Sequence, residues 1–219
     1  MTRQRVVTAI LAVATVVTAS CSNLPRSRDL GNPAVAGQTL AEQVCSNCHG
    51  VTGMSVSPNA PNLAGQQREY LVGQLKEFRG HDRRDPAGFE YMWGIARSLS
   101  DRQVDDLAAY FSAQTATSQP FEGDTAAAAT GSTIFAQGIA AQGVPPCGSC
   151  HGPDGLGNGA FPRLAGQHAD YLVKQLTVFQ RTDERPNGAV MQTVAHKLTT
   201  ADILNVAAYI QTLPRPATR

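Results

Sequence analysis

PNLAGQQREYLVGQLKEF, from Pro61 to Phe78, recurs as PRLAGQHADYLVKQLTVF, from Pro162 to Phe179. This repeat decides how the chain folds. The two segments match at 11 of 18 positions, whereas unrelated segments of ordinary composition match at about one. A Cys-x-x-Cys-His sequence precedes each segment and a methionine follows each, in the same order and at similar distances. The chain therefore contains two copies of one domain.

Both copies have the periodicity of helices. Apolar residues recur three and four positions apart within residues 70–78 and in their counterparts in the second copy. The final segment of each copy begins with capping-box spacing, Ser100 with Gln103 and Thr199 with Asp202. No segment alternates convincingly at period two. We predict an all-α protein of two tandem helical domains related by duplication.

Composition separates the two copies. Residues 115–130, TATSQPFEGDTAAAAT, are small and polar and are interrupted by Pro120 and Gly123, which is typical of a linker. We therefore predict a first domain over residues 31–114 and a second domain over residues 131–214.

The N-terminal residues 1–20 have the pattern of an export signal. Arg3 and Arg5 precede an uncharged apolar run of fourteen residues that ends at Ala19, which is too short to span a bilayer as a helix. The sequence VTASC ending at Cys21 also resembles a bacterial lipobox, in which Cys21 becomes the lipidated first residue and anchors the protein to a membrane. The alternative is ordinary cleavage nearby, with Cys21 free or removed. Either interpretation predicts a protein that leaves the cytoplasm.

The charge balance excludes one class of partner. Without residues 1–20, Lys and Arg fall from 18 to 16 against 17 acidic residues, so the net charge of the exported chain is −1. A protein with no basic surplus is not expected to bind nucleic acid.

The sequences CSNCH at 45–49 and CGSCH at 147–151 are the attachment signature of covalent haem. Two cysteines three residues apart share one face of a helical turn, so both can form thioethers with one haem, and the next histidine can reach the iron. Zinc sites and redox dithiols also use Cys-x-x-Cys, but two such motifs at equivalent places behind an export signal favour two covalently bound haem c groups. The predicted covalent anchors are Cys45, Cys48, Cys147 and Cys150, and the predicted proximal iron ligands are His49 and His151.

The sixth iron ligand is predicted from the methionines. Met92 lies 43 residues after His49 and Met191 lies 40 residues after His151, so the two occupy matching places. Met54 lies five residues after His49 and has Leu156 as its counterpart, which predicts a packing role. The rival ligands are His81, His168 and His196, none of which is duplicated in the other copy.

Other repeated residues predict the surroundings of each haem. Glycines follow each motif, at residues 50 and 53 and throughout 152–159, and we expect them to let the backbone turn closely against the haem edge. A phosphate-binding loop is excluded because the Lys-Ser/Thr pair is missing. The carbonyls of Pro61 and Pro162 are expected to orient the histidines. Candidates for the haem-packing shell are Leu63, Tyr70, Leu164 and Tyr171.

These motifs, together with the endings LSDRQVDDLAAYF and LTTADILNVAAYIQTL, resemble the cytochrome c4 family of dihaem proteins over about residues 37–213. The two PxLAGQ segments are the most specific part of the resemblance. It implies two cytochrome c-like domains with adjacent haem edges, His49/Met92 and His151/Met191 coordination, and periplasmic delivery of electrons to a terminal oxidase. The chain departs from the family in its lipobox-like segment and in the charged residues 81–85.

The predicted iron ligands bear on three candidate functions. An electron carrier without enzymatic activity, which takes electrons from a quinol-oxidising complex or a dehydrogenase, is favoured because both irons have a His and a Met. An electron-accepting subunit of a dehydrogenase, such as a flavin-dependent sulfide dehydrogenase, uses the same residues. A dihaem peroxidase needs a displaceable iron ligand, which Met92 and Met191 argue against.

Overall fold

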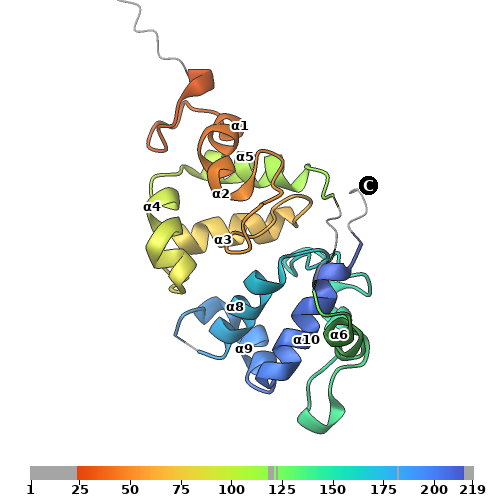
Figure 1. Cartoon of the computed structure of the whole chain (residues 1–219). Helices are drawn as coiled ribbons and strands as arrows, with labels where there is room; N and C mark the ends of the chain where they lie inside the picture. The colour runs from red at the N-terminus through yellow and green to blue at the C-terminus, as the bar shows by residue number, and fades with distance from the viewer. Residues whose placement is uncertain (1–23, 118–120, 122, 182, 215–219) are drawn as a thin grey trace, which may run out of the picture.

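The computed structural model describes residues 24–117, 121, 123–181 and 183–214. The predicted export segment, residues 1–20, and Cys21 lie outside the described residues. Figure 1 shows two helical bodies that lie against each other, each formed by one half of the sequence. We call them the first domain and the second domain.

The first domain contains two long helices, α3 and α5, and several short ones. In chain order its elements are η1 (Leu24–Arg26), α1 (Gly37–Leu40), the π-helical turn η2 (Ala41–Cys45), α2 (Ser46–His49), α3 (Arg68–Arg79), the π-helical turn η3 (Gly88–Met92), α4 (Trp93–Ala96) and α5 (Asp101–Ser112).

The second domain repeats this order with a longer first helix. Its elements are α6 (Thr125–Gln137), η4 (Ala140–Gln142), α7 (Gly148–His151), α8 (Ala169–Phe179), η5 (Pro186–Gly188), α9 (Ala189–Ala195) and α10 (Thr200–Thr212).

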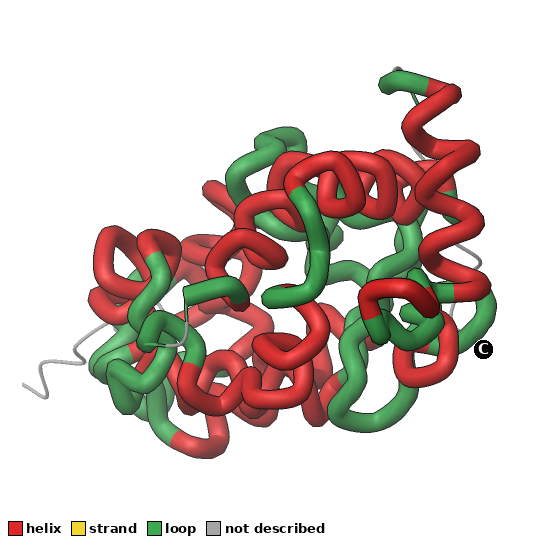
Figure 2. Tube along the Cα trace, turned by 90° about the horizontal axis from the view of Figure 1, so that it is seen from below, coloured by secondary structure: helices red, strands yellow, loops and turns green. Residues whose placement is uncertain are grey.

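The all-α prediction is confirmed. Figure 2 shows helices joined by loops throughout the described chain. β-type pairing among the described residues is limited to two isolated bridges, Ile139 with Val144 and Asn158 with Phe161. No helix in this part of the chain is long and apolar enough to cross a membrane.

Both predicted capping boxes are present. The backbone N–H of Ser100 donates to Gln103 Oε1 at 3.0 Å while Ser100 Oγ accepts from the Gln103 N–H at 3.3 Å. Thr199 and Asp202 make the same pair of bonds at 2.9 and 3.2 Å. Each box satisfies two donors at the start of the last helix of its domain.

Helix α6 begins at Thr125, inside residues 115–130, whose composition indicates a linker. Asp124 caps this helix by accepting hydrogen bonds from the N–H groups of Ala126 and Ala127 at 2.8 and 3.1 Å. Alanine is the best helix former, so the alanine run after the cap is helical and not extended. The domain boundaries themselves stay a prediction.

In each domain the first helix crosses the last helix at a glycine. α1 packs against α5, and α6 packs against α10. A Cβ atom on Gly37 would lie 2.3 Å from Asp106 Cβ, and one on Gly131 would lie 2.0 Å from the Asn205 carbonyl oxygen. Only glycine lets the two backbones approach so closely.

The PNLAGQ and PRLAGQ segments exchange hydrogen bonds between the domains. The side chain of Gln66 accepts from the N–H of Arg163 at 2.7 Å and donates to its carbonyl at 2.9 Å. The side chain of Gln167 makes the same two bonds with Asn62, at 2.8 and 3.0 Å. Because Gln66 and Gln167 are repeat equivalents, the domains meet around a pseudo-twofold axis.

Candidate functional site

Each Cys-x-x-Cys-His motif lies on one helical turn. Cys45 ends η2 and Cys48 lies in α2, whereas Cys147 directly precedes α7 and Cys150 lies within it. Burial raises the pKa of the Cys45 and Cys147 thiols to about 11, while Cys48 and Cys150 are exposed. Both motifs therefore present one inner and one outer thiol beside the histidine that follows.

The two histidines are oriented by proline carbonyls, as the sequence predicts. His49 Nδ1 lies 2.9 Å from the Pro61 oxygen, and His151 Nδ1 lies 2.9 Å from the Pro162 oxygen. A carbonyl only accepts, so Nδ1 carries the hydrogen and Nε2 keeps its lone pair for a metal. Burial lowers the pKa of both imidazoles against the opposing effect of these hydrogen bonds. Both rings are therefore neutral and able to bind iron at neutral pH.

The two methionines lie at matching places after the long middle helix of each domain. Met92 ends η3 after α3, and Met191 lies in α9 after α8. Both belong to the wall of one continuous cavity of about 590 Å³, which also contacts His49 and His151. The structure thus brings each histidine and its predicted methionine to the same space.

The cavity extends through both domains. All four residues predicted for the haem-packing shell line it, namely Leu63, Tyr70, Leu164 and Tyr171. Cys45, Cys147 and Cys150 lie on the same wall. A cavity with apolar walls and two sets of thiols, imidazole and thioether has the donors that two haems require.

Comparison with known proteins agrees with this site. Residues 34–114 and residues 128–214 each match the family described as Cytochrome c. The chain is 41% identical over 192 residues to cytochrome c4 of Azotobacter vinelandii, an alignment that covers 82% of this chain and 89% of that protein. This chain belongs to the cytochrome c4 family. As a member of that family, the cytochrome has two haem c sites, one in each domain, and is an electron carrier and not an enzyme.

A solved structure and a second relative extend the comparison. The crystal structure of reduced recombinant cytochrome c4 from Pseudomonas stutzeri aligns with a TM-score of 0.71 at 39% identity and covers 84% of this chain and 99% of that one. The cytochrome is also 35% identical over 177 residues to a thiosulfate dehydrogenase electron acceptor of Stutzerimonas stutzeri, which covers 79% of this chain and 80% of that protein.

The rival iron ligands lie away from the cavity wall. His81 stacks on the indole of Trp93 with ring centroids 4.3 Å apart. His168 Nε2 lies 3.0 Å from the carbonyl oxygen of Ser55, across the domain boundary. His196 Nδ1 lies 2.7 Å from the carbonyl oxygen of Gln192. In the described part of the cytochrome, no cluster of three or more His, Cys, Asp or Glu could hold a metal ion.

The glycines after the motifs approach the PxLAGQ segment closely, while their expected contact with the haem edge stays a prediction. The carbonyls of Gly53 and Gly155 accept from the N–H groups of Leu63 and Leu164 at 2.7 Å each. A Cβ on Gly53, whose φ is +74°, would lie 2.7 Å from the Ala64 nitrogen. These glycines therefore bring the motif loop against the PxLAGQ segment, whose proline orients the histidine.

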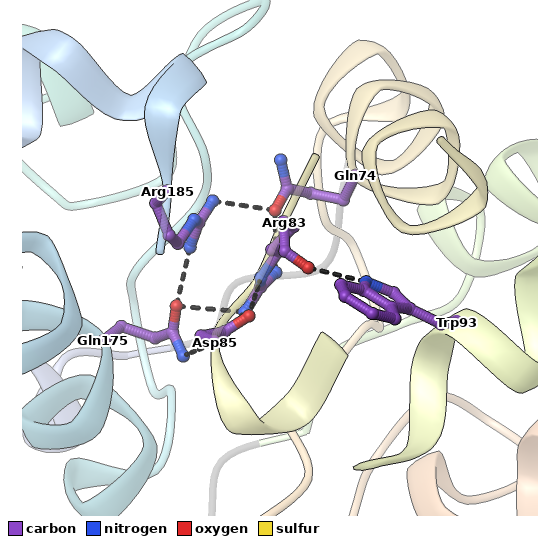
Figure 3. Close-up of polar contacts among 6 residues, drawn as sticks. All are labelled: Gln74, Arg83, Asp85, Trp93, Gln175 and Arg185. Atoms are coloured by element: carbon purple, nitrogen blue, oxygen red, sulfur yellow. Dashed lines mark hydrogen bonds and ion pairs between the residues drawn. The ribbon is translucent and has the colours of Figure 1, made fainter. Parts of the chain in front are cut away.

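A buried polar cluster, which the sequence did not predict, lies between the domains and is formed by Gln74, Arg83, Asp85, Gln175 and Arg185 (Figure 3). A charged stretch such as residues 81–85 normally indicates a solvated loop, yet Arg83 and Asp85 are 3% and 1% exposed. The one available signal was that a basic residue, Arg83 or Arg185, precedes the methionine in both copies.

Unpartnered donors provide a test of whether the cytochrome's residues fit haem. Among the described residues, Arg163 Nη2 and Arg185 Nε are buried and have no hydrogen-bond partner. Both arginines line the cavity. Buried donors of this kind require an acceptor, and haem has two carboxylate side chains, so the cavity fits it in charge as well as in apolar lining.

Proposed function

We propose that this cytochrome transfers single electrons through two haem irons, one that His49 and Met92 would hold and one that His151 and Met191 would hold. The observation that carries the proposal is the matched pair of histidine and methionine on one cavity, present twice. Bound haem supplies the one-electron chemistry. The chain supplies neutral, oriented imidazoles and soft thioethers that favour ferrous iron and raise the potential.

Cys45 with Cys48, and Cys147 with Cys150, are proposed to anchor the haems through thioethers. Covalent anchoring and two protein ligands on each iron keep the geometry similar in both oxidation states, which suits fast electron transfer. A peroxidase reaction needs a displaceable ligand, so the complete ligand sets argue against that alternative.

The test is a haem count with ferric and ferrous optical spectra, made on protein matured by a periplasmic cytochrome c assembly system. We expect two covalent haems, each with a methionine–iron charge-transfer band. One haem, or high-spin iron in either domain, would contradict the proposed ligand sets.

We further propose that the cytochrome takes electrons from a quinol-oxidising complex and delivers them to a terminal oxidase. Membership of the cytochrome c4 family supports this direction. Stopped-flow mixing of the reduced cytochrome with oxidase-containing membranes should reoxidise it at a rate that saturates with membrane concentration. Membranes that lack the oxidase are the control and should leave it reduced.

A second function, the electron acceptor of a dehydrogenase, is favoured by one specific observation. The relative at 35% identity is named as the electron acceptor of a thiosulfate dehydrogenase. If that function holds here, a thiosulfate dehydrogenase with thiosulfate should reduce the oxidised cytochrome faster than a quinol-oxidising complex does. The opposite order would favour the respiratory function.

We propose a periplasmic location, supported by the signal-like residues 1–20 and by the family. Anchoring through Cys21 is a separate proposal. Replacement of Cys21 by Ala should move the cytochrome from the membrane fraction to the periplasmic fraction if Cys21 is lipidated. An unchanged distribution would contradict the lipid anchor.

A further inference from the structure

Arg83 and Arg185 occupy equivalent places on either side of the domain boundary. The guanidinium carbon of Arg83 lies 4.6 Å from the ring centroid of Phe78, and that of Arg185 lies 4.6 Å from the ring centroid of Phe179. Phe78 and Phe179 are repeat equivalents. The two arginines are therefore related by the pseudo-twofold axis.

The same two glutamines bridge both arginines (Figure 3). The Gln74 oxygen accepts from Arg83 Nη1 at 2.7 Å and from Arg185 Nη2 at 2.8 Å. The Gln175 oxygen accepts from Arg185 Nη1 at 2.6 Å and from Arg83 Nη2 at 3.0 Å. These four hydrogen bonds are symmetric about the pseudo-twofold axis.

A carboxylate is present on only one side. Asp85 accepts from Arg83 Nε at 2.9 Å and from Nη2 at 3.0 Å, a bidentate ion pair. The chain runs directly from Arg185 to Pro186 and places no carboxylate at the corresponding position. Arg185 is only 5% exposed, and its Nε is buried without a partner among the described residues.

The ion pair of Asp85 with Arg83 shows that a carboxylate fits beside this edge of the guanidinium, and the same edge of Arg185 has no partner among the described residues. A buried guanidinium edge without an acceptor is costly, and its symmetry mate holds a carboxylate. Arg185 lines the haem cavity. The neighbouring Glu184 pairs with Arg181 at 3.0 Å through Oε1, and its Oε2 is buried without a partner among the described residues. Because both Glu184 Oε2 and Arg185 Nε lack a partner, they do not bond to each other, and the carboxylate expected beside Arg185 is part of the content of the cavity.

We propose that the Nε edge of Arg185 binds a carboxylate side chain of the haem in the second domain, in the position that Asp85 takes beside Arg83. Arg163, with its own unpartnered Nη2, is the second buried donor on the cavity wall. Its repeat counterpart, Asn62, is neutral. The two haems are thus held by different charges, and Arg185 is a positioning residue of the second site. The inference rests on the proposed function.

Asp85 and Tyr171 interact electrostatically with Arg185, and Tyr70 lies beside Tyr171. Arg83 shares the two glutamines with Arg185, and Glu184 directly precedes it in the chain. Although burial opposes ionisation of Asp85, the charges of Arg83 and Arg185 and the hydrogen bonds from Arg83 and Gln175 hold its pKa below the usual range. Burial raises the pKa of Tyr171. Asp85 and Tyr171 therefore keep their charge states between about pH 5 and 8. A titration in that window, made also on E184Q, reports on the haem carboxylate.

The experiment is a spectroelectrochemical titration of the holoprotein and of R185Q between pH 5 and 8, with each haem identified by the NMR signal of its methionine methyl group. Loss of the cation should stabilise the ferric state of the second haem. The equilibrium constant for electron transfer from the second haem to the first should rise at least tenfold, which corresponds to about 59 mV. Because the carboxylate loses its partner, its pKa should rise. The potential of the second haem should then become pH-dependent. R185K should restore part of the potential.

E184Q is the control for the chain's own carboxylate, because Glu184 Oε2 is buried without a partner among the described residues and Glu184 directly precedes Arg185. It should leave both potentials unchanged. A second-haem potential in R185Q that is shifted but no more pH-dependent than in wild type would overturn the proposal. So would a wild-type potential that depends on chloride or phosphate concentration, because the partner would then be a free anion. Loss of a haem or of a methionine band in wild type would instead contradict the proposed function itself.

Discussion

The two domains share a cavity, a proposed set of iron ligands and a polar cluster, but they differ in how their buried charges are balanced. In the first domain Arg83 is paired with Asp85 and the residue after the repeated proline is the neutral Asn62. In the second, Arg185 and Arg163 each keep a buried donor without a partner among the described residues. The predicted iron ligands are the same in both copies, while the buried charges around them differ. Coordination and electrostatic tuning are therefore separable in this fold.

The axial methionines offer the strongest test of the equivalence of the domains. Met92→Ala and Met191→Ala should each lower the potential of one haem only, by roughly 0.1 to 0.2 V within the range of about 0.8 V that axial ligands set, and abolish its methionine–iron band. Met54→Ala is the control and should change neither haem. A variant that altered both haems equally would show that the domains are not independent sites.

Asp85 tests the asymmetry of the interface. Asp85→Asn should lower the free energy of unfolding by about 3 kcal/mol, because it leaves buried Arg83 without its counter-charge. Asp101→Asn is the matched control, since its pair with Arg79 lies at the surface, and it should have little effect. Equal destabilisation in chemical denaturation would show that burial of the first pair has no energetic consequence.

The same carboxylate predicts a pH dependence. The pKa of Asp85 is lower in the folded state than in the unfolded chain, so its stabilisation is complete above the unfolded value of about 3.9. It is lost as the pH falls through the folded pKa. Wild-type stability should therefore fall more steeply below about pH 4 than that of D85N. Parallel acid unfolding curves would contradict this.

The helix crossings test whether the domains are packed alike. Gly37→Ala and Gly131→Ala should each destabilise their domain by about 1 to 3 kcal/mol, because the added methyl group overlaps the opposite helix. In α4, Gly94 has open space around its Cα, and Gly94→Ala should instead stabilise by up to about 1 kcal/mol. Thermal denaturation measures all three.

The smallest predicted difference lies in the caps. Ser100→Ala and Thr199→Ala should each cost about 1 kcal/mol. Gln103 also donates to the carbonyls of Asn32 and Val35 at 3.0 and 3.1 Å. Gln103→Ala should therefore destabilise more than Asp202→Ala, as measured by urea unfolding. Equal losses of unfolding free energy in the two variants would show that the bonds from Gln103 to Asn32 and Val35 do not stabilise the first domain.

The sequence predicted the parts of the molecule that obey local rules. Helical periodicity, both capping boxes and the proline carbonyls beside His49 and His151 act over short distances or repeat in both copies, so the pattern showed them. The burial of Arg83 and Asp85 depends on the approach of the second domain, which no local pattern encodes. The start of α6 was missed because alanine is common in linkers and helices alike, and only the hydrogen bonds of Asp124 distinguish them.

The reciprocal bonds of Gln66 and Gln167 have an evolutionary consequence. Each glutamine binds the backbone of the other domain with the same geometry, so the contact surface is complementary to itself. A single ancestral domain with this surface would pair with a second copy as a symmetric dimer before any gene fusion. Fusion of two copies then lets the halves accumulate different substitutions, since each side of the contact has its own coding segment. The carboxylate of Asp85, present beside Arg83 and not beside Arg185, is a difference of this kind.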